Sequence, residues 1–312
     1  MADIAHRTVV RVPSFSEVAV VYALVVLLGC CFGFQYSMAR MMGAAQVDPL
    51  GALFWIHLIL ATGFSGILIV TRRTFVPSAW HIVVFVLIAL FANLGQLGIE
   101  VIAAHHISAG ELTLIVSLFP VFVLILAALF RTEPLNGKRV AGIVIAALCC
   151  SVIMLPSALA GHSGIWWLAL TFVAPVSQAI GAIIMACFWP RRLDPLQVAT
   201  GNLLAGTALL VPVVLTSSDT MGLDVHSLNG IWAIIGFGAT VAGEFYIFAA
   251  LTRRRGAVIA SCADFVAVIA GLIFGYLFFA EVPTIWMALA ATLCLASLKL
   301  VMDNRKTAGD LA

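Results

Sequence analysis

Long apolar stretches separated by short polar breaks run along most of this chain. The breaks contain arginine pairs, prolines, glycines and small polar clusters, and they divide the sequence into ten apolar stretches. Each stretch has about 20 residues or more, the length that an α-helix needs to cross a bilayer. The predicted helices span residues 17–39, 48–70, 79–103, 109–130, 136–155, 163–188, 195–216, 228–251, 256–280 and 283–302. We therefore expect an all-α integral membrane protein with ten transmembrane helices.

The composition excludes several other classes of protein. Hydrophobic residues make up 63% of the 312 positions and charged residues 10%, against about 45–50% and about 25% in ordinary soluble domains. The net charge of +2 is spread over short clusters, which gives no basic face for nucleic acid. The seven cysteines all lie in apolar stretches. Their spacing suits neither zinc nor a secreted disulfide framework, so we expect buried free thiols.

The basic residues indicate how the helices are oriented, because Lys and Arg stay on the cytoplasmic side of short loops. With the amino terminus inside, fifteen of the sixteen basic residues lie in cytoplasmic segments, and Arg40 lies outside. This asymmetry supports an even number of spans. It predicts a multi-pass protein of the plasma (inner) membrane with both termini in the cytoplasm.

The two halves of the chain repeat the same sequence features. Glu133 and Glu281 each close the fourth helix of their half, and an Asp-Pro pair at 48–49 and at 194–195 opens the second. Because five is odd, a duplicated five-helix unit enters the membrane from opposite sides. Such inverted repeats place a substrate site near the midplane. The predicted units are a cytoplasmic segment 1–16, a first repeat 17–155, a second repeat 163–302 and a cytoplasmic tail 303–312.

The sequence resembles the EamA family of the drug/metabolite transporter superfamily. The resemblance rests on the ten-span plan and on Gly33 to Arg40, Asp48-Pro49, Leu118 to Pro120, Glu133 and Glu281. It covers essentially the whole chain and implies two five-helix EamA repeats that transport a small organic metabolite. The sequence departs from the family pattern at His57, where an arginine is common, and near Val266 to Val268, where a proline is expected.

Two carboxylates stand out at membrane depth within the predicted spans, where an unpaired charge costs about 2.5–3.5 kcal/mol or more. Glu244 lies about seven residues before the inner end of its span and Asp264 about eight residues into the next. At 1.5 Å per residue, both lie roughly 10–12 Å from the same membrane face. A shared cavity would raise one pKa, as proton coupling requires. The alternative is that each pairs with one of Arg253 to Arg255.

Polar residues in other spans are further candidates for the transport pathway. Gln96 corresponds to Glu244 in the repeat, at a mirrored depth, and Asn93 lies one turn earlier on the same helical face. His57 lies near the middle of the second span. The remaining intramembrane amides are Gln35, Gln178 and Asn202. The alternative for each is a structural hydrogen bond between helices.

The outer turn after the third span contains a carboxylate and imidazole set of the kind that divalent metals use. It comprises Glu100, His105, His106 and Glu111, without regular ligand spacing. We therefore expect a solvated polar turn, and neither a metal nor another cofactor.

Glycines and prolines inside the spans bear on helix packing. Glycine pairs at 29/33 and 271/275 have the spacing that permits close helix approach, although chance accounts for about as many pairs. Pro120 and Pro175 can break their helices.

These features predict a secondary transporter that exports a small amino-acid-like or drug-like metabolite by alternating access, with proton coupling left open. The expected partners are the lipid bilayer, the small-molecule substrate and protons, and either a monomer or a homodimer fits. An integral membrane enzyme is the alternative from another class, but we find no nucleophile, metal set or phosphate-binding loop that would support one. A passive channel is the third reading.

Overall fold

The structure is a computed structural model in which every regular element of the described residues is helical. It describes residues 15–107, 109–132, 137–145, 147–148, 164–190, 192–216 and 227–280, together with single positions between 289 and 300. Within these residues, seven helices or helix series are long and apolar enough to cross a membrane. They are Val18–Ala44, Pro49–Val70, Ala79–Ala103, Ile165–Cys187, Pro195–Thr216, Leu228–Arg255 and Ala257–Phe279. The chain is therefore an all-α membrane protein.

Four of the membrane-length helices are continuous. They are α1 (Phe15–Ala44), α2 (Pro49–Val70), α10 (Pro195–Thr216) and α11 (Leu228–Arg255). The bounds of α2 and α10 agree closely with the apolar stretches that predicted them. By contrast, α1 extends past the predicted end at residue 39, and α11 extends past residue 251. Both extensions include basic residues, so the charges mark the ends of the apolar stretches and not the ends of the helices.

The other spans are divided into shorter helices. The segments are α3 (Ala79–Ile88), the π-helix η1 (Ala89–Gly98), α4 (Ile99–Ala103), α5 (Ala109–Val116), α6 (Phe119–Phe130), α8 (Ile165–Thr171), α9 (Val173–Cys187), α12 (Ala257–Ser261) and α13 (Ala263–Phe279). The interruption before α6 precedes Pro120, whose missing N–H and ring disfavour a continuous helix. Pro175 follows the interruption before α9 in the same way. The interruption at Cys262 and the π-helix have no such signal in the sequence.

Several predicted features lie outside the described residues. The predicted fifth helix, 136–155, is described in part as helix over 137–145, and the tenth, 283–302, at single positions. Glu133 and Glu281, which mark the repeat, are outside the described residues, as are most of the segment 1–16 and all of the tail 303–312.

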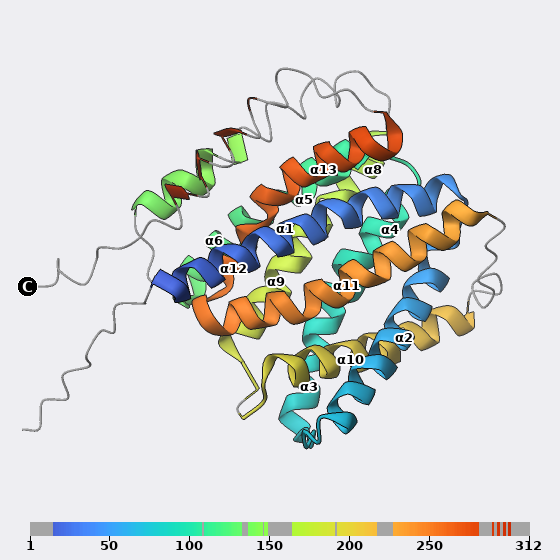
Figure 1. Cartoon of the computed structure of the whole chain (residues 1–312), viewed down its shortest axis with the longest axis vertical. Helices are drawn as coiled ribbons and strands as arrows, with labels where there is room; N and C mark the ends of the chain where they lie inside the picture. The colour runs from blue at the N-terminus through green and yellow to red at the C-terminus, as the bar shows by residue number, and fades with distance from the viewer. Residues whose placement is uncertain are drawn as a thin grey trace, which may run out of the picture.

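Helices from the two halves of the chain pack against one another throughout the bundle. In Figure 1, α1 lies between α13 and α11, and these two pairs have the most extensive contacts among the described helices. Helix α2 packs on α10, while α9 packs on η1 and α6. The interior of the bundle is therefore made jointly by both halves.

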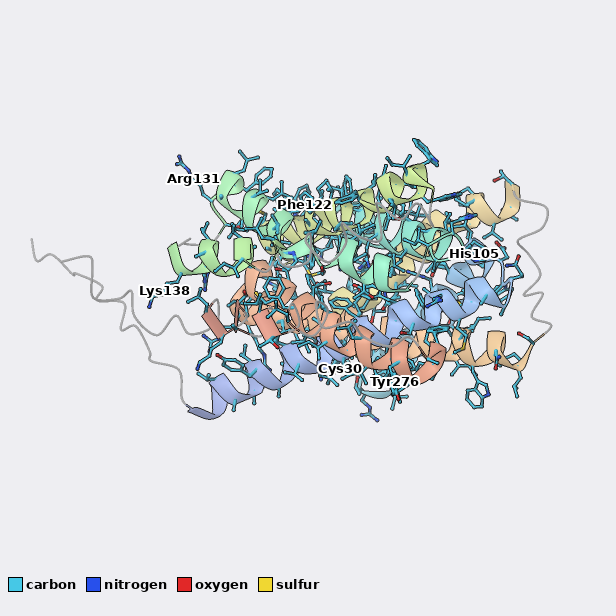
Figure 2. The ribbon with its side chains drawn as sticks, turned by 90° about the horizontal axis from the view of Figure 1, so that it is seen from above. Cys30, His105, Phe122, Arg131, Lys138 and Tyr276 are labelled. Carbon is cyan, nitrogen blue, oxygen red and sulfur yellow. The ribbon has the colours of Figure 1, made fainter. Side chains whose placement is uncertain are left out.

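The two ends of the bundle carry different residues. Figure 2 places Arg131 and Lys138 at one end and His105 near the other. Arg131 directly follows α6, and His105 follows α4, so these labels identify two loop regions on opposite ends of the helices.

The repeated Asp-Pro pairs begin helices for the same physical reason. Asp48 caps α2 by accepting a hydrogen bond from Gly51 N at 3.0 Å, and Pro49 occupies the first helical position. Asp194 accepts from Gln197 N at 3.0 Å at the start of α10. The carboxylate satisfies a backbone N–H that has no partner within the helix, and proline has no N–H to satisfy.

The four described cysteines are free thiols. Cys262 is buried, as expected, but Cys30 and Cys187 are exposed on the outside of the bundle. The expectation of burial was wrong for these two, because an apolar stretch in a membrane protein also covers the lipid-facing surface.

Glycine permits the close approach of α1 and α13. A Cβ placed on Gly33 would lie 2.6 Å from Ala270 Cβ and 2.6 Å from the backbone N of Gly271. Gly29 meets Ala263 and Val266 in the same interface. The glycine pair that chance alone explained is thus part of the largest contact between the halves.

We predict that Gly33→Ala lowers the thermal stability of the purified protein in detergent. The added methyl group must push the two helices apart, at a cost of about 1–3 kcal/mol. Gly63→Ala is the matched control, because nothing lies within 4 Å of its Cβ position and alanine favours the helix by up to about 1 kcal/mol. Equal midpoints for Gly33→Ala and wild type would contradict the packing described here.

Candidate functional site

The eight side chains predicted for the transport pathway are all buried. Their exposed fractions run from 0% for Gln35 and Gln96 to 7% for Glu244. The others are His57, Asn93, Gln178, Asn202 and Asp264. Burying this many polar groups is costly unless each one finds a hydrogen-bond partner or meets water or a ligand.

Four of these side chains line one small cavity. Gln96 comes from η1, Gln178 from α9, Asn202 from α10 and Glu244 from α11, so both halves of the chain contribute. The cavity holds about 30 Å³, enough for one or two water molecules. Phe245 and Phe248 are part of its otherwise apolar lining. Gln96 and Glu244, which the repeat paired at mirrored depths, therefore face the same space.

A third carboxylate, Glu100, organises the amides beside this cavity. Gln96 Nε2 donates to Glu100 Oε1 at 2.7 Å, and Gln35 Nε2 donates to Glu100 Oε2 at 3.4 Å. Gln35 also hydrogen-bonds Glu244, and the charge of Glu100 acts on Glu244. Glu100 is completely buried. It belongs to the same polar cluster as the predicted residues.

This position corrects the expectation that Glu100 belongs to a solvated outer turn. Its helix, α4, packs against α1, α2 and α8, so the end of the third span is enclosed by protein. His106 stacks on Trp167 with ring centroids 3.6 Å apart. Within the described residues, no three His, Cys, Asp or Glu side chains come together to hold a metal, and the side chain of Glu111 lies outside them.

Burial and neighbouring charges both act on His105, in the turn after α4. Burial lowers the pKa of His105, the neighbouring His106 lowers it further, and Asp48 acts in the opposite direction. His105 is consequently neutral at neutral pH.

Asp264 occupies a neighbouring position but does not line the cavity. Tyr36 Oη donates to Asp264 Oδ1 at 3.3 Å, which joins α13 to α1. The charge of Asp264 acts on Glu244. The two carboxylates are thus electrostatic neighbours, whereas the expected shared cavity is lined by Glu244 and not by Asp264. Arg253, the alternative partner, instead donates to Leu193 O at 3.2 Å.

His57 and Asn93 connect the cluster to α2 and α10. His57 Nδ1 lies 2.9 Å from Leu53 O, and the ring meets the Phe245 ring edge to face at 5.9 Å. Asn93 Nδ2 donates to Asn202 O at 3.3 Å and to Asn202 Oδ1 at 3.4 Å. Gly206 leaves room for both side chains, because a Cβ at this position would meet the His57 ring and the Asn93 amide.

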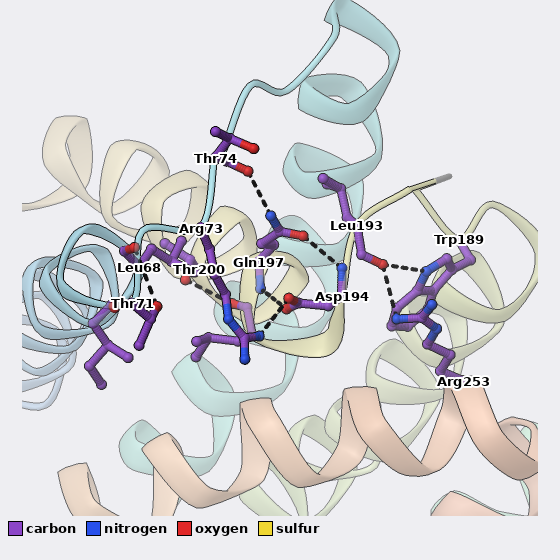
Figure 3. Close-up of polar contacts among 12 residues, drawn as sticks. Leu68, Thr71, Arg73, Thr74, Trp189, Leu193, Asp194, Gln197, Thr200 and Arg253 are labelled. Atoms are coloured by element: carbon purple, nitrogen blue, oxygen red, sulfur yellow. Dashed lines mark hydrogen bonds and ion pairs between the residues drawn. The ribbon is translucent and has the colours of Figure 1, made fainter.

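A second group of polar contacts closes one end of the bundle (Figure 3). Arg73 Nη1 pairs with Asp194 Oδ2 at 2.6 Å, and Gln197 Nε2 donates to Thr74 O at 2.7 Å. Trp189 Nε1 donates to Leu193 O at 3.3 Å. These bonds, with that of Arg253, tie the loop after α2 to the loop before α10 and to the end of α11. We call them the end latch.

Sequence reasoning missed Glu100 as a cluster member and Asp194 as the partner of Arg73. The spacing of Gln96 and Glu100 at i and i+4 places both on one helical face, and this signal was available. Nothing in the sequence pairs Arg73 with Asp194, since the two are 121 positions apart.

Comparison with known proteins agrees with this architecture. Residues 19–155 match the EamA-like transporter family. An "uncharacterized transporter" of Archaeoglobus fulgidus is 28% identical over 189 residues, which cover 58% of this chain and 62% of that protein. The match therefore spans less than two thirds of that relative. Protein PecM of Dickeya dadantii is 25% identical over 218 residues, covering 69% of this chain and 71% of that protein.

A solved crystal structure has a similar fold. Its TM-score with this chain is 0.67 at 16% identity, and the match covers 89% of this chain and 97% of that one. The buried polar cluster, the membrane-length helices and the family match lead to one assignment. The chain is an all-α membrane protein whose residues 19–155 match the EamA-like transporter family.

Proposed function

We propose that this protein is a secondary transporter that exports a small organic metabolite by alternating access. The observation that carries the proposal is the cavity lined by Gln96, Gln178, Asn202 and Glu244, because polar groups from both halves of a membrane protein converge on it. The names of the relatives also support a transporter over an enzyme. The small size of the cavity favours a carrier over a passive channel, which needs a continuous polar path.

We further propose ten helices arranged as two inverted repeats, residues 17–155 and 163–302. The contacts between helices support this arrangement. The first helix of the first half, α1, packs on the third and fourth spans of the second half, α11 and α13. The first span of the second half, through α9, packs on the third and fourth spans of the first half, η1 and α6. The second helices, α2 and α10, pack on each other.

The end latch fits one closed side of an alternating-access cycle. Two of its bonds, Arg73 with Asp194 and Gln197 with Thr74, join loops of different halves, so opening that side requires these two bonds to break. We propose that this is the cytoplasmic side of an inner-membrane protein, because Arg73, Arg253 and the other basic residues gather on the loops predicted to be cytoplasmic.

Labelling of single introduced cysteines tests this orientation. Arg254→Cys, at the exposed end of α11, should react with a membrane-impermeant maleimide only when the membrane is made permeable, so that the reagent reaches the cytoplasmic side. His106→Cys, in the exposed outer turn, should react in intact cells. Both experiments use a background in which the native cysteines are replaced, and the reverse pattern of labelling would show the orientation to be inverted.

The transport proposal predicts saturable exchange of a labelled metabolite in proteoliposomes, accelerated by unlabelled metabolite on the opposite side. Gln96→Leu should reduce the apparent affinity about tenfold or more, because loss of buried hydrogen bonds costs about 1–3 kcal/mol. Asn229→Leu, at an exposed position at the start of α11, should exchange like wild type. A rate that rises linearly with concentration would instead indicate a channel, and no exchange across a broad panel of metabolites would exclude the proposal.

We also propose proton coupling through Glu244, Asp264 or both. Glu244 interacts with Glu100, Asp264 and Gln35, and also with Cys31, while Asp264 faces Tyr36. Carboxylates that lie close enough to act on each other electrostatically inside the membrane are suited to hold and release a proton.

An imposed pH gradient should drive metabolite accumulation by the wild-type protein. Asp264→Asn should lose this pH-driven accumulation but keep exchange at equal pH, since asparagine retains the size and the acceptor for Tyr36. Asp48→Asn is the control, because asparagine caps a helix as well as aspartate does. If accumulation by the wild-type protein does not depend on the pH gradient, proton coupling is refuted. If Asp264→Asn keeps the pH-driven accumulation of wild type, Glu244 is left as the residue that carries the proton.

A further inference from the structure

The cavity is rich in hydrogen-bond acceptors that have no donor. Three of its lining side chains each leave a buried oxygen without a partner among the described residues: Gln96 Oε1, Gln178 Oε1 and Glu244 Oε2. Beside them, Asn93 Oδ1 and Gln35 Oε1 are in the same state. A buried oxygen with no donor costs about 1–3 kcal/mol. Such an arrangement favours a ligand that brings N–H or O–H groups.

Hydrogen bonds to neighbours determine which amide atoms remain. The amides of Gln35 and Gln96 both turn their NH₂ groups toward the carboxyl oxygens of Glu100. The carbonyl oxygen of Gln96 is then left for the cavity. The NH₂ group of Asn93 is likewise used by Asn202. Glu100 is in this way a positioning residue that presents acceptor oxygens to the cavity.

The charges around the cavity have one sign. Glu244 lines it, and the charged neighbours that act on Glu244 are Glu100 and Asp264. No Lys or Arg is found among the described residues that line the cavity. A carboxylate or phosphate on a ligand would therefore find no cationic partner there, whereas a cation is attracted.

The rest of the lining favours an organic cation over a metal ion. Phe245 and Phe248 line the cavity, and aromatic rings attract cations within about 6 Å by roughly 0.5–2 kcal/mol. Hard divalent cations take about six or more oxygen ligands, more than these three oxygens supply. An ammonium group has three N–H donors, and its size suits a cavity of about 30 Å³.

We propose that this cavity binds the protonated amine of an organic amine that carries no carboxylate, with Gln96, Gln178 and Glu244 accepting its three N–H groups. The inference rests on the proposed function, since it names the substrate class of the same site. A cavity of about 30 Å³ has room for the ammonium group and not for the apolar body of the amine, which has to lie beyond it.

Equilibrium binding to the purified full chain in detergent tests this directly with four compounds of similar shape. Phenethylamine carries the ammonium alone, phenylalanine adds a carboxylate, 3-phenylpropionate has the carboxylate alone and 2-phenylethanol is neutral. We expect phenethylamine to bind saturably and about tenfold or more tightly than each of the other three. Equal or tighter binding of the carboxylate or the alcohol would overturn the proposal, as would full displacement of phenethylamine by sodium at equal concentration.

Variants then locate the binding site. Glu244→Gln should weaken phenethylamine binding about tenfold or more and leave the weak binding of 2-phenylethanol unchanged. Gln178→Leu, which removes one acceptor without removing charge, should weaken it to a smaller extent and serves if Glu244→Gln does not fold. Asp48→Asn removes a charge outside the cavity and should bind like wild type. Wild-type affinity in both cavity variants would overturn the assignment.

Failure of this inference can be distinguished from failure of the proposed function. Saturable exchange of neutral or anionic metabolites without amine binding would overturn the amine site and keep the transporter. Amine binding that depends on Glu244, without exchange of any labelled compound, would keep the site and overturn the transporter.

Discussion

Hydrocarbon offers no hydrogen-bond partners, and this constraint governs every element of the bundle. Backbone groups in lipid must be satisfied within a helix, so irregular backbone at membrane depth has to be enclosed by protein. The interruption at Cys262 and the π-helix η1 meet this condition, because Cys262 is completely buried and both α12 and η1 pack against helices from elsewhere in the chain.

The same constraint explains why the polar interior is a connected cluster. Glu100 accepts from Gln35 and Gln96, Asn93 donates to Asn202, and Tyr36 donates to Asp264. Each of these bonds joins residues of different spans except the one between Gln96 and Glu100, which both lie in the span Ala79–Ala103. Small residues make the close approach possible, as at Gly206, where His57 and Asn93 both reach α10. Polar cluster and tight packing therefore depend on each other.

The sequence predicted the seven membrane-length spans of the described residues, because span length follows from bilayer thickness, which a run of apolar residues reports directly. The bounds of α2 and α10 illustrate this. It predicted burial of the polar residues for the same reason, since each lies inside an apolar run. It did not predict which face of a helix meets which neighbour, because helices with apolar residues on every side carry little directional signal. Glu100 was consequently assigned to the surface, and the π-helix and the break at Cys262 had no marker of their own.

The two carboxylate oxygens of Asp194 bind different partners, and this has an energetic consequence. Oδ1 holds the first turn of α10, and Oδ2 holds Arg73. Loss of the arginine therefore leaves the start of the helix folded, so no backbone has to unravel when the two loops separate. A partly exposed ion pair of this kind is worth only about 0–1 kcal/mol. The latch is thus easily reversible, and the barrier to separating the two halves lies in the helix interfaces, above all in the glycine contact between α1 and α13.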